Sequence, residues 1–195
     1  MRTVDMFGVL AFSLYLVWCY SICFAKPSTY NFRVTRIQCE NLDPRVSYNH
    51  SCSTRNLNRT LKAHNIRIAF YPNISFNDIH VQINYNLKVN NLYRRSFINM
   101  EEDFCGFTSG TSKSYLIKIL WPFLKRSSNL PDTCPLIGYV NITDLVFEDT
   151  YLPPALPEGE ARIDIHVRNG PKRISMIMVK FFVEIKAKGA AKLDF

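Results

Sequence analysis

The stretch IHVQINYNLKVN, residues 79–90, decides the fold class of this 195-residue chain. Apolar side chains stand at its odd positions and polar side chains at its even positions, through six repeats. A period of two is typical of a β-strand that buries one face, and it does not fit the helical period of 3.6. The sequence therefore predicts a long, half-buried strand. Its apolar positions are Ile79, Val81, Ile83, Tyr85, Leu87 and Val89.

The rest of the chain carries further strand patterns with turn signals between them. Alternation over 66–70 and 138–147 predicts two more strands, and 93–107 is predicted to be the partner of the first. Near the C-terminus, the turn signal Asn169-Gly170 predicts a hairpin. Several strands of this kind are typical of an antiparallel β-sandwich.

One segment changes to helical spacing. Residues 112–128, which lie between Cys105 and Cys134, place apolar side chains three and four positions apart. A serine near the start can cap this helix, and Pro122 is expected to kink it or to end it early. The predicted fold class is therefore mainly β, a sandwich with one short helix between these two cysteines.

The last strand of the predicted hairpin, SMIMVKFFVEI at 175–185, is apolar on both faces. A strand that buries only one face should alternate with polar residues instead. The second apolar face therefore indicates either a cavity wall that contacts an apolar ligand or a face covered by the helix at 112–128. Methionine suits a cavity for an acyl chain or a sterol, because its side chain adapts to irregular shapes. The candidate ligand-lining residues are Met176, Met178, Phe181 and Phe182, and the pattern leaves open which face points inward.

The first 25 residues have the layout of a secretory signal peptide. One Arg precedes an apolar run from Met6 to about Tyr20, and small residues fit a cleavage site after Ala25. An uncleaved membrane anchor is the alternative, because the run approaches the length that spans a bilayer. We expect cleavage and secretion, a single domain at 26–186 and a flexible tail at 187–195.

Cysteines and glycosylation signals point to the same extracellular compartment. Four cysteines follow the signal peptide, and an even number in a secreted chain predicts two disulfides with three possible pairings. A zinc site is not expected, because the chain has no Cys-x-x-Cys pair. The cysteines are Cys39, Cys52, Cys105 and Cys134, and the Asn-x-Ser/Thr signals are at Asn49, Asn58, Asn73 and Asn141.

The formal net charge is +8 and the pI is about 9.2, which raises the possibility of a nucleic-acid partner. The basic residues are scattered along the chain, however, and no recognisable nucleic-acid module is present. We therefore expect a solvated basic surface.

No motif for catalysis is found. The chain lacks a Gly-x-Ser-x-Gly elbow, a His-Glu-x-x-His helix and a phosphate-binding Gly-rich loop. His80 and His166 fall on the polar faces of predicted strands and are expected to face solvent. The acids Glu101, Glu102 and Asp103 alternate between strand faces, so they are expected to be solvated charges and not a catalytic pair. We predict no enzymatic activity, no cofactor and no metal.

A set of short motifs resembles a known family. The order and spacing of the motifs, more than any one of them, carry the resemblance, which spans about residues 35–185. The chain resembles a large insect family of secreted proteins of unknown function that includes the chemosensory-B pheromone-perception proteins. That family is related to the ML (MD-2-related) lipid-recognition domains, such as the ganglioside activator and the Niemann–Pick sterol carrier. The motifs are Ile37-Gln38-Cys39, Ser51-Cys52, Leu57-Asn58-Arg59-Thr60, Asp103-Phe104-Cys105, Ser128-Asn129-Leu130, Cys134-Pro135-Leu136 with Gly138, and Pro157-Glu158-Gly159.

The resemblance implies an immunoglobulin-like, ML-like sandwich whose two sheets separate to admit a lipid. It also implies the disulfide pairs Cys39–Cys52 and Cys105–Cys134, and it favours the cavity wall for residues 175–185. The residues 157–161 depart from the family, because relatives often place an aromatic residue soon after the glycine. The leading hypothesis is a secreted, non-enzymatic binding protein for a small apolar ligand such as a lipid or hydrocarbon, in chemosensation. The alternative is a secreted glycoprotein interaction module or co-receptor with a filled core and no ligand.

Overall fold

The computed structural model describes residues 30–40, 43–59, 61–147 and 156–188. The predicted signal peptide at 1–25 lies outside the described residues. Of the predicted tail at 187–195, only the first two residues are described, and the first of them still belongs to a strand.

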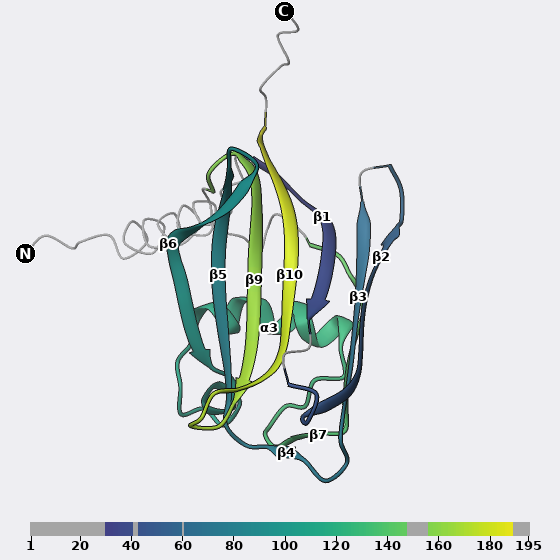
Figure 1. Ribbon diagram of the computed structural model, residues 1–195, viewed down its shortest axis with the longest axis vertical. Helices are drawn as coiled ribbons and strands as arrows, with labels where there is room; N and C mark the ends of the chain where they lie inside the picture. The colour runs from purple at the N-terminus through teal and green to yellow at the C-terminus, as the bar shows by residue number, and fades with distance from the viewer. Residues whose placement is uncertain (1–29, 41–42, 60, 148–155, 189–195) are drawn as a thin grey trace, which may run out of the picture.

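The larger of two main sheets has five antiparallel strands, which face the viewer in Figure 1. The predicted strand at 79–90 is one of them, and its observed bounds differ from the prediction by a single residue. In spatial order the strands are β1 (Tyr30–Glu40), β10 (Ile174–Ala187), β9 (Gly159–Asn169), β5 (Ile79–Val89) and β6 (Leu92–Asp103).

A smaller antiparallel sheet packs against the inner face of the larger one. Apolar residues of β3 and β10 belong to one core cluster, so the two sheets enclose a common interior. This arrangement confirms the predicted fold class, a mainly β antiparallel sandwich. The smaller sheet has the order β2 (Ser47–Asn56), β3 (Lys62–Phe70) and β8 (Tyr139–Leu145), and a separate two-stranded ribbon joins β4 (Ser75–Phe76) to β7 (Leu136–Ile137).

The described residues contain two helices, whereas the sequence predicted one. The additional helix, α2 (Phe104–Thr108), begins where the predicted strand was expected to continue. It begins there because the Asp103 carboxylate accepts a hydrogen bond from the backbone N–H of Gly106 at 2.8 Å. A Cβ atom at position 106 would lie 2.2 Å from that carboxylate, so only glycine allows this close approach.

The predicted helix is α3 (Tyr115–Ser127). Its cap is Ser114, whose hydroxyl accepts from the backbone N–H of Ile117 at 3.1 Å. Pro122 lies inside the helix and does not end it, contrary to the expectation of an early end. In Figure 1, α3 lies behind β5, β9 and β10, over the inner face of the large sheet.

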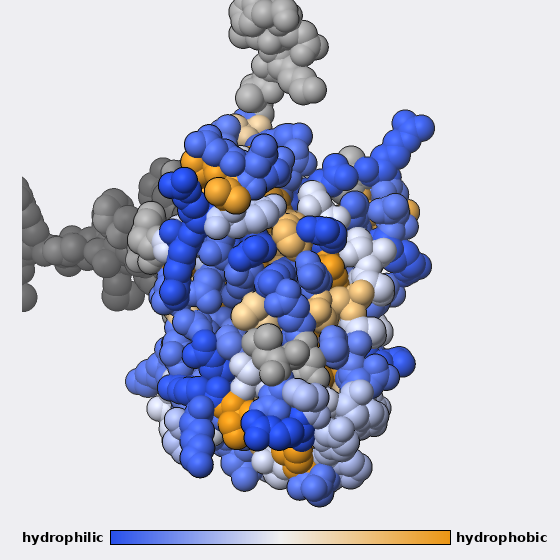
Figure 2. All heavy atoms as spheres, in the orientation of Figure 1, coloured by the Kyte–Doolittle hydropathy of each residue, from blue (hydrophilic) through white to orange (hydrophobic). Residues whose placement is uncertain are grey.

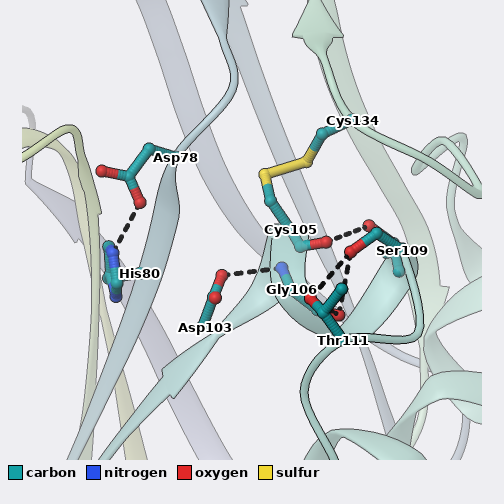
Figure 3. Close-up of a disulfide and its surroundings, with 9 residues drawn as sticks. Asp78, His80, Asp103, Cys105, Gly106, Ser109, Thr111 and Cys134 are labelled. Atoms are coloured by element: carbon teal, nitrogen blue, oxygen red, sulfur yellow. Dashed lines mark hydrogen bonds and ion pairs between the residues drawn. A yellow bond between two sulfur atoms is a disulfide. The ribbon is translucent and has the colours of Figure 1, made fainter.

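Two disulfides connect parts of the fold that are distant in sequence. Cys39–Cys52 joins β1 of the large sheet to β2 of the small sheet. Cys105–Cys134 joins α2 to the segment before β7 (Figure 3). Along the chain, α3 lies between these two cysteines. These are the two pairs that the family resemblance implies.

The register of β10 answers which face of residues 175–185 points inward. A β-bulge between Ser175 and Ile177 also places Met176 inward, so this residue leaves the phase of Met178 and Phe182. The buried inward residues are Met176, Ile177, Val179, Phe181, Val183 and Ile185. Helix α3 therefore covers the inner face of β10 and not the second face that contains Met178 and Phe182.

Candidate functional site

A cavity of about 230 Å³ lies between the inner faces of the two sheets and α3. The side chains that line it come from β3, β5, β9, β10 and α3, together with the segments around β7 and β8. Every lining residue among the described residues is apolar except Glu102. A space of this kind can hold an apolar molecule and offers almost no polar group to water.

Central strands show that the interior is incompletely filled. Ile165 and Val167 point inward from β9, which has a strand on each side, yet both keep part of their surface accessible. Val81 and Ile83 on the neighbouring β5 also point inward and also keep part of their surface accessible. Inward residues of central strands should be fully buried in a close-packed sandwich. Their accessible surface faces the cavity.

Helix α3 forms the wall opposite the large sheet. Ile117 and Phe123 are buried, and Trp121 packs between Phe104 and Phe107 of α2, with ring centroids 5.6 and 6.0 Å apart. The disulfide at Cys105 therefore holds α2 at a position where α2 supports the helix.

An aromatic cluster around Phe147 forms another part of the wall. The Phe147 ring lies 5.4 Å from that of Phe181 and 5.8 Å from that of Phe123. His64 stands at 6.2 Å from the same ring and is only 1% exposed. Its Nδ1 lies 3.1 Å from the Thr54 hydroxyl, and burial lowers the pKa of His64 to about 4, with a smaller contribution from the charge of Lys62.

The structure separates the four predicted ligand-lining residues. Met176 and Phe181 line the cavity, and their role in binding stays a prediction. Met178 and Phe182 lie on the outer face, because successive side chains of a strand point to opposite sides. This finding corrects their predicted place in the wall.

Polar neighbours cover the apolar residues of the outer face. The guanidinium of Arg36 lies 4.0 Å from the centre of the Phe182 ring, and the Tyr93 ring approaches edge-on at 5.7 Å. Figure 2 shows this face of the molecule as mostly hydrophilic. On this second apolar face, Phe182 therefore packs against the side chains of Arg36 and Tyr93.

His166 on this outer face is buried, contrary to the expectation that it faces solvent. It is 9% exposed. The Ser175 hydroxyl pairs with its Nε2, and Arg168 donates a hydrogen bond to its Nδ1 at 3.2 Å. Burial and the charge of Arg168 lower its pKa. His80 is more exposed, and its Nε2 pairs with Asp78 at 2.7 Å (Figure 3). Neither histidine lines the cavity.

The three adjacent acids at the end of β6 have three different environments. Glu101 pairs with Arg173 at 2.7 Å on the outer face, and Asp103 caps α2. Glu102 lies opposite Val81 on the inward face and is among the residues that line the cavity, although the cavity surface itself is entirely apolar. The alternation of strand faces was the signal that could have placed this residue inside.

The described residues offer little for other chemistry. They contain no group of three or more His, Cys, Asp or Glu side chains that could hold a metal ion. Within the same residues, no helix has the length and apolar character that crossing a bilayer requires.

Three predicted glycosylation sites, Asn49, Asn58 and Asn73, are exposed, and Asn141 is half-buried.

Comparisons with known proteins give a match to a protein family and similarity to solved structures. The family described as "Protein of unknown function (DUF1091)" matches residues 79–163, from the start of β5 into β9. No curated protein matches the sequence. The chain is also similar to chicken MD-1 in its crystal structure with lipid IVa, at 15% identity and a TM-score of 0.35, over 80% of this chain and 97% of that chain. At this TM-score the likeness carries no argument about a ligand, which must be inferred from the cavity itself.

Proposed function

We propose that this protein is a secreted, non-enzymatic binding protein for a small apolar ligand, a lipid or a hydrocarbon. The observation that carries the proposal is the cavity of about 230 Å³ with its apolar wall. An empty cavity of this size weakens a sandwich, because the lining atoms lose contacts that a filled core would make. A ligand restores those contacts, so binding is favourable.

The cavity volume limits the size of the ligand. A protein cavity of roughly 150 Å³ with an apolar wall is large enough for benzene. The cavity here is larger, about 230 Å³, and suits a short hydrocarbon or one section of a longer chain. Met176 at its wall adapts its side chain to the shape of the occupant.

Secretion is supported by the disulfides and by the exposed glycosylation signals. Disulfides persist in oxidising compartments. A role in chemosensation comes only from the resemblance to the insect chemosensory-B proteins and belongs to the same proposal. The rival function, an interaction module with a filled core, is less well supported because Ile165 and Val167 keep accessible surface on a central strand.

The first test asks whether the protein carries or binds an apolar molecule. Native mass spectrometry of the secreted, deglycosylated protein, followed by organic extraction, should reveal a reproducible apolar molecule. In parallel, the neutral fluorescent probe N-phenyl-1-naphthylamine should bind with a saturable increase in fluorescence. A clean apo mass combined with no probe binding would contradict the proposal.

A matched pair of variants places the binding inside the sandwich. Val167→Phe puts a large ring into the cavity and should weaken probe binding on the order of tenfold or more. The control is the same substitution at Val89, which is 43% exposed at the end of β5 and outside the cavity, and it should leave binding unchanged. Equal effects of the two variants, with both folded by circular dichroism, would place the probe elsewhere.

A further inference from the structure

The exposed tyrosines of the described residues all stand beside glycosylation signals. Each precedes the asparagine of an Asn-x-Ser/Thr signal by one or two positions. A large aromatic side chain in water leaves its apolar surface uncovered, so this repeated placement points to a contact with the glycan. The pairs are Tyr48 with Asn49, Tyr71 with Asn73, and Tyr139 with Asn141.

Tyr71 and Asn73 belong to one β-turn, which follows β3 at the lower end of the small sheet (Figure 1). The backbone N–H of Ile74 donates to the Tyr71 carbonyl at 3.0 Å, and Pro72 stands at the position that its fixed φ suits. The first and fourth Cα atoms of such a turn lie within about 7 Å of each other. The side chains of Tyr71 and Asn73 therefore begin close together, and both are exposed.

A second tyrosine supports the Tyr71 ring. Tyr48 comes from β2, at the bulge where the register with β3 shifts. Its ring centroid lies 5.4 Å from that of Tyr71, with the two planes at 50°. Tyr48 is 61% exposed and Tyr71 is 37% exposed, so the pair still presents aromatic surface to solvent. The two strands thus hold an aromatic surface beside the exposed Asn73.

The chemistry of the first sugar of an N-glycan fits such a surface. N-acetylglucosamine has a face formed by C–H groups, whose hydrogens carry a small positive charge. The face of an aromatic ring is negative and attracts them. Stacking also removes apolar surface of both groups from water. A sugar attached to Asn73 is already tethered beside the ring, so little further freedom is lost when the contact forms.

We propose that the first sugar of an N-glycan at Asn73 stacks on Tyr71, which Tyr48 supports, and that this contact stabilises the fold. The inference rests on the secretion that is part of the proposed function and does not depend on the apolar ligand. The competing explanation is that the two rings bind another protein and that the glycan does not contact them.

The experiment measures whether the sugar and the ring act together. The protein is secreted from cells that make only high-mannose glycans, so that endoglycosidase H leaves one N-acetylglucosamine at each occupied site. Ser75→Ala removes the signal at Asn73. In urea unfolding, this change should raise the equilibrium constant of unfolding about three- to tenfold, the size of one aromatic contact. In the Tyr71→Leu background it should have almost no effect.

Two controls assign the effect to the ring and to this site. Tyr71→Phe keeps the ring without its hydroxyl and should keep the full effect of Ser75→Ala. Thr60→Ala removes the signal at Asn58, which has no aromatic residue in the two positions before it. Its effect should be the same in the wild type and in Tyr71→Leu. After complete enzymatic removal of the glycans, the coupling between positions 71 and 75 should vanish.

Nuclear magnetic resonance gives a direct readout of the contact. The ring current of Tyr71 should shift the proton signals of the Asn73 sugar upfield, and Tyr71→Leu should remove the shift. Unshifted sugar protons, or an equal effect of Ser75→Ala with and without the Tyr71 ring, would overturn the inference.

The outcomes also separate this inference from the proposed function. An Asn73 without a glycan, found by peptide mass spectrometry while other sites are occupied, would refute the sugar contact alone. Bare asparagines at all four sites would refute the contact and remove the support that the glycosylation signals give to secretion. Failure of N-phenyl-1-naphthylamine to bind, together with a coupled effect of positions 71 and 75, would refute the apolar ligand and support the sugar contact.

Discussion

At the scale of single residues, His64 couples the stability of the fold to pH. The unfolded chain binds this proton near pH 6.5, whereas the folded protein binds it only near pH 4, because the ring is buried. A base with a lowered pKa in the folded state contributes stability that is complete above pH 6.5 and is lost as pH falls toward 4. The total loss is roughly 3 kcal/mol, of which about 2 kcal/mol has been lost by pH 5.

We predict that the free energy of unfolding, measured by urea titration, decreases between pH 7.5 and pH 5. His64→Asn should flatten this slope, because asparagine does not titrate in this range and can still bond to Thr54. His166→Asn should flatten it less, because His166 is 9% exposed and His64 only 1%. A slope that is unchanged in His64→Asn would show that other groups cause the pH dependence.

At the scale of elements, the sequence predicted those that carry a strong period. The strand at 79–90 matches β5 because six apolar positions alternate without interruption. Strand β2 (Ser47–Asn56) was missed, because SYNHSCSTRN has almost no apolar residues and is held in place by its pairing with β3. Helix α2 was missed because its start depends on one side-chain cap and one close contact at Gly106. The place of Met176 depends on a bulge, which the alternation of strand residues does not predict.

The disulfide Cys105–Cys134 is predicted to hold the helical wall of the cavity. Its cysteines are 29 residues apart, and replacing both with serine should lower the free energy of unfolding by about 3 to 4 kcal/mol on the chain-entropy description. The same change should weaken probe binding, because α2 then loses its connection beside α3. Urea unfolding and probe titration measure the two effects.

The matched control is the double replacement of Cys39 and Cys52, which are 13 residues apart and join β1 to β2. It should cost a similar free energy, about 3 kcal/mol, but leave probe binding intact in the folded fraction, because no residue of β1 or β2 lines the cavity. Equal losses of binding in the two double variants would show that the cavity depends on global stability and not on the position of α3.

At the scale of the whole molecule, the cavity follows from the distance between the sheets and from the position of α3. Neither is encoded in the period of any one strand, so the sequence suggested an apolar wall without locating it. The inward residues of β3, β5 and β9 were predictable from alternation, whereas β10 is apolar on both faces and its inward face was not. The contributions of Trp121 and Phe147 were not, because these side chains reach the cavity from a helix and a loop whose placement is set by tertiary packing.

The distribution of glycosylation signals leads to the last prediction. All four lie in the small sheet or in the loops beside β3, and the five strands of the large sheet carry none. Asn49 and Asn141 lie in β2 and β8, where their register partners on β3 are Ala69 and Arg67. Arg67 is exposed, and the inward face of β3 carries Ile66, Ile68 and Phe70 instead. Glycans attached there would extend away from the cavity.

We therefore predict that enzymatic removal of N-glycans leaves the affinity for N-phenyl-1-naphthylamine unchanged. Peptide mass spectrometry should find higher occupancy at the exposed Asn49 and Asn73 than at Asn141, which is half-buried and whose backbone N–H donates to Asn129 at 2.6 Å. A glycan must remain in solvent, so a half-buried attachment site accommodates it poorly. A change in probe affinity after deglycosylation would contradict this prediction. It would show that the glycans reach the mouth of the cavity although they are attached to the small sheet and its loops.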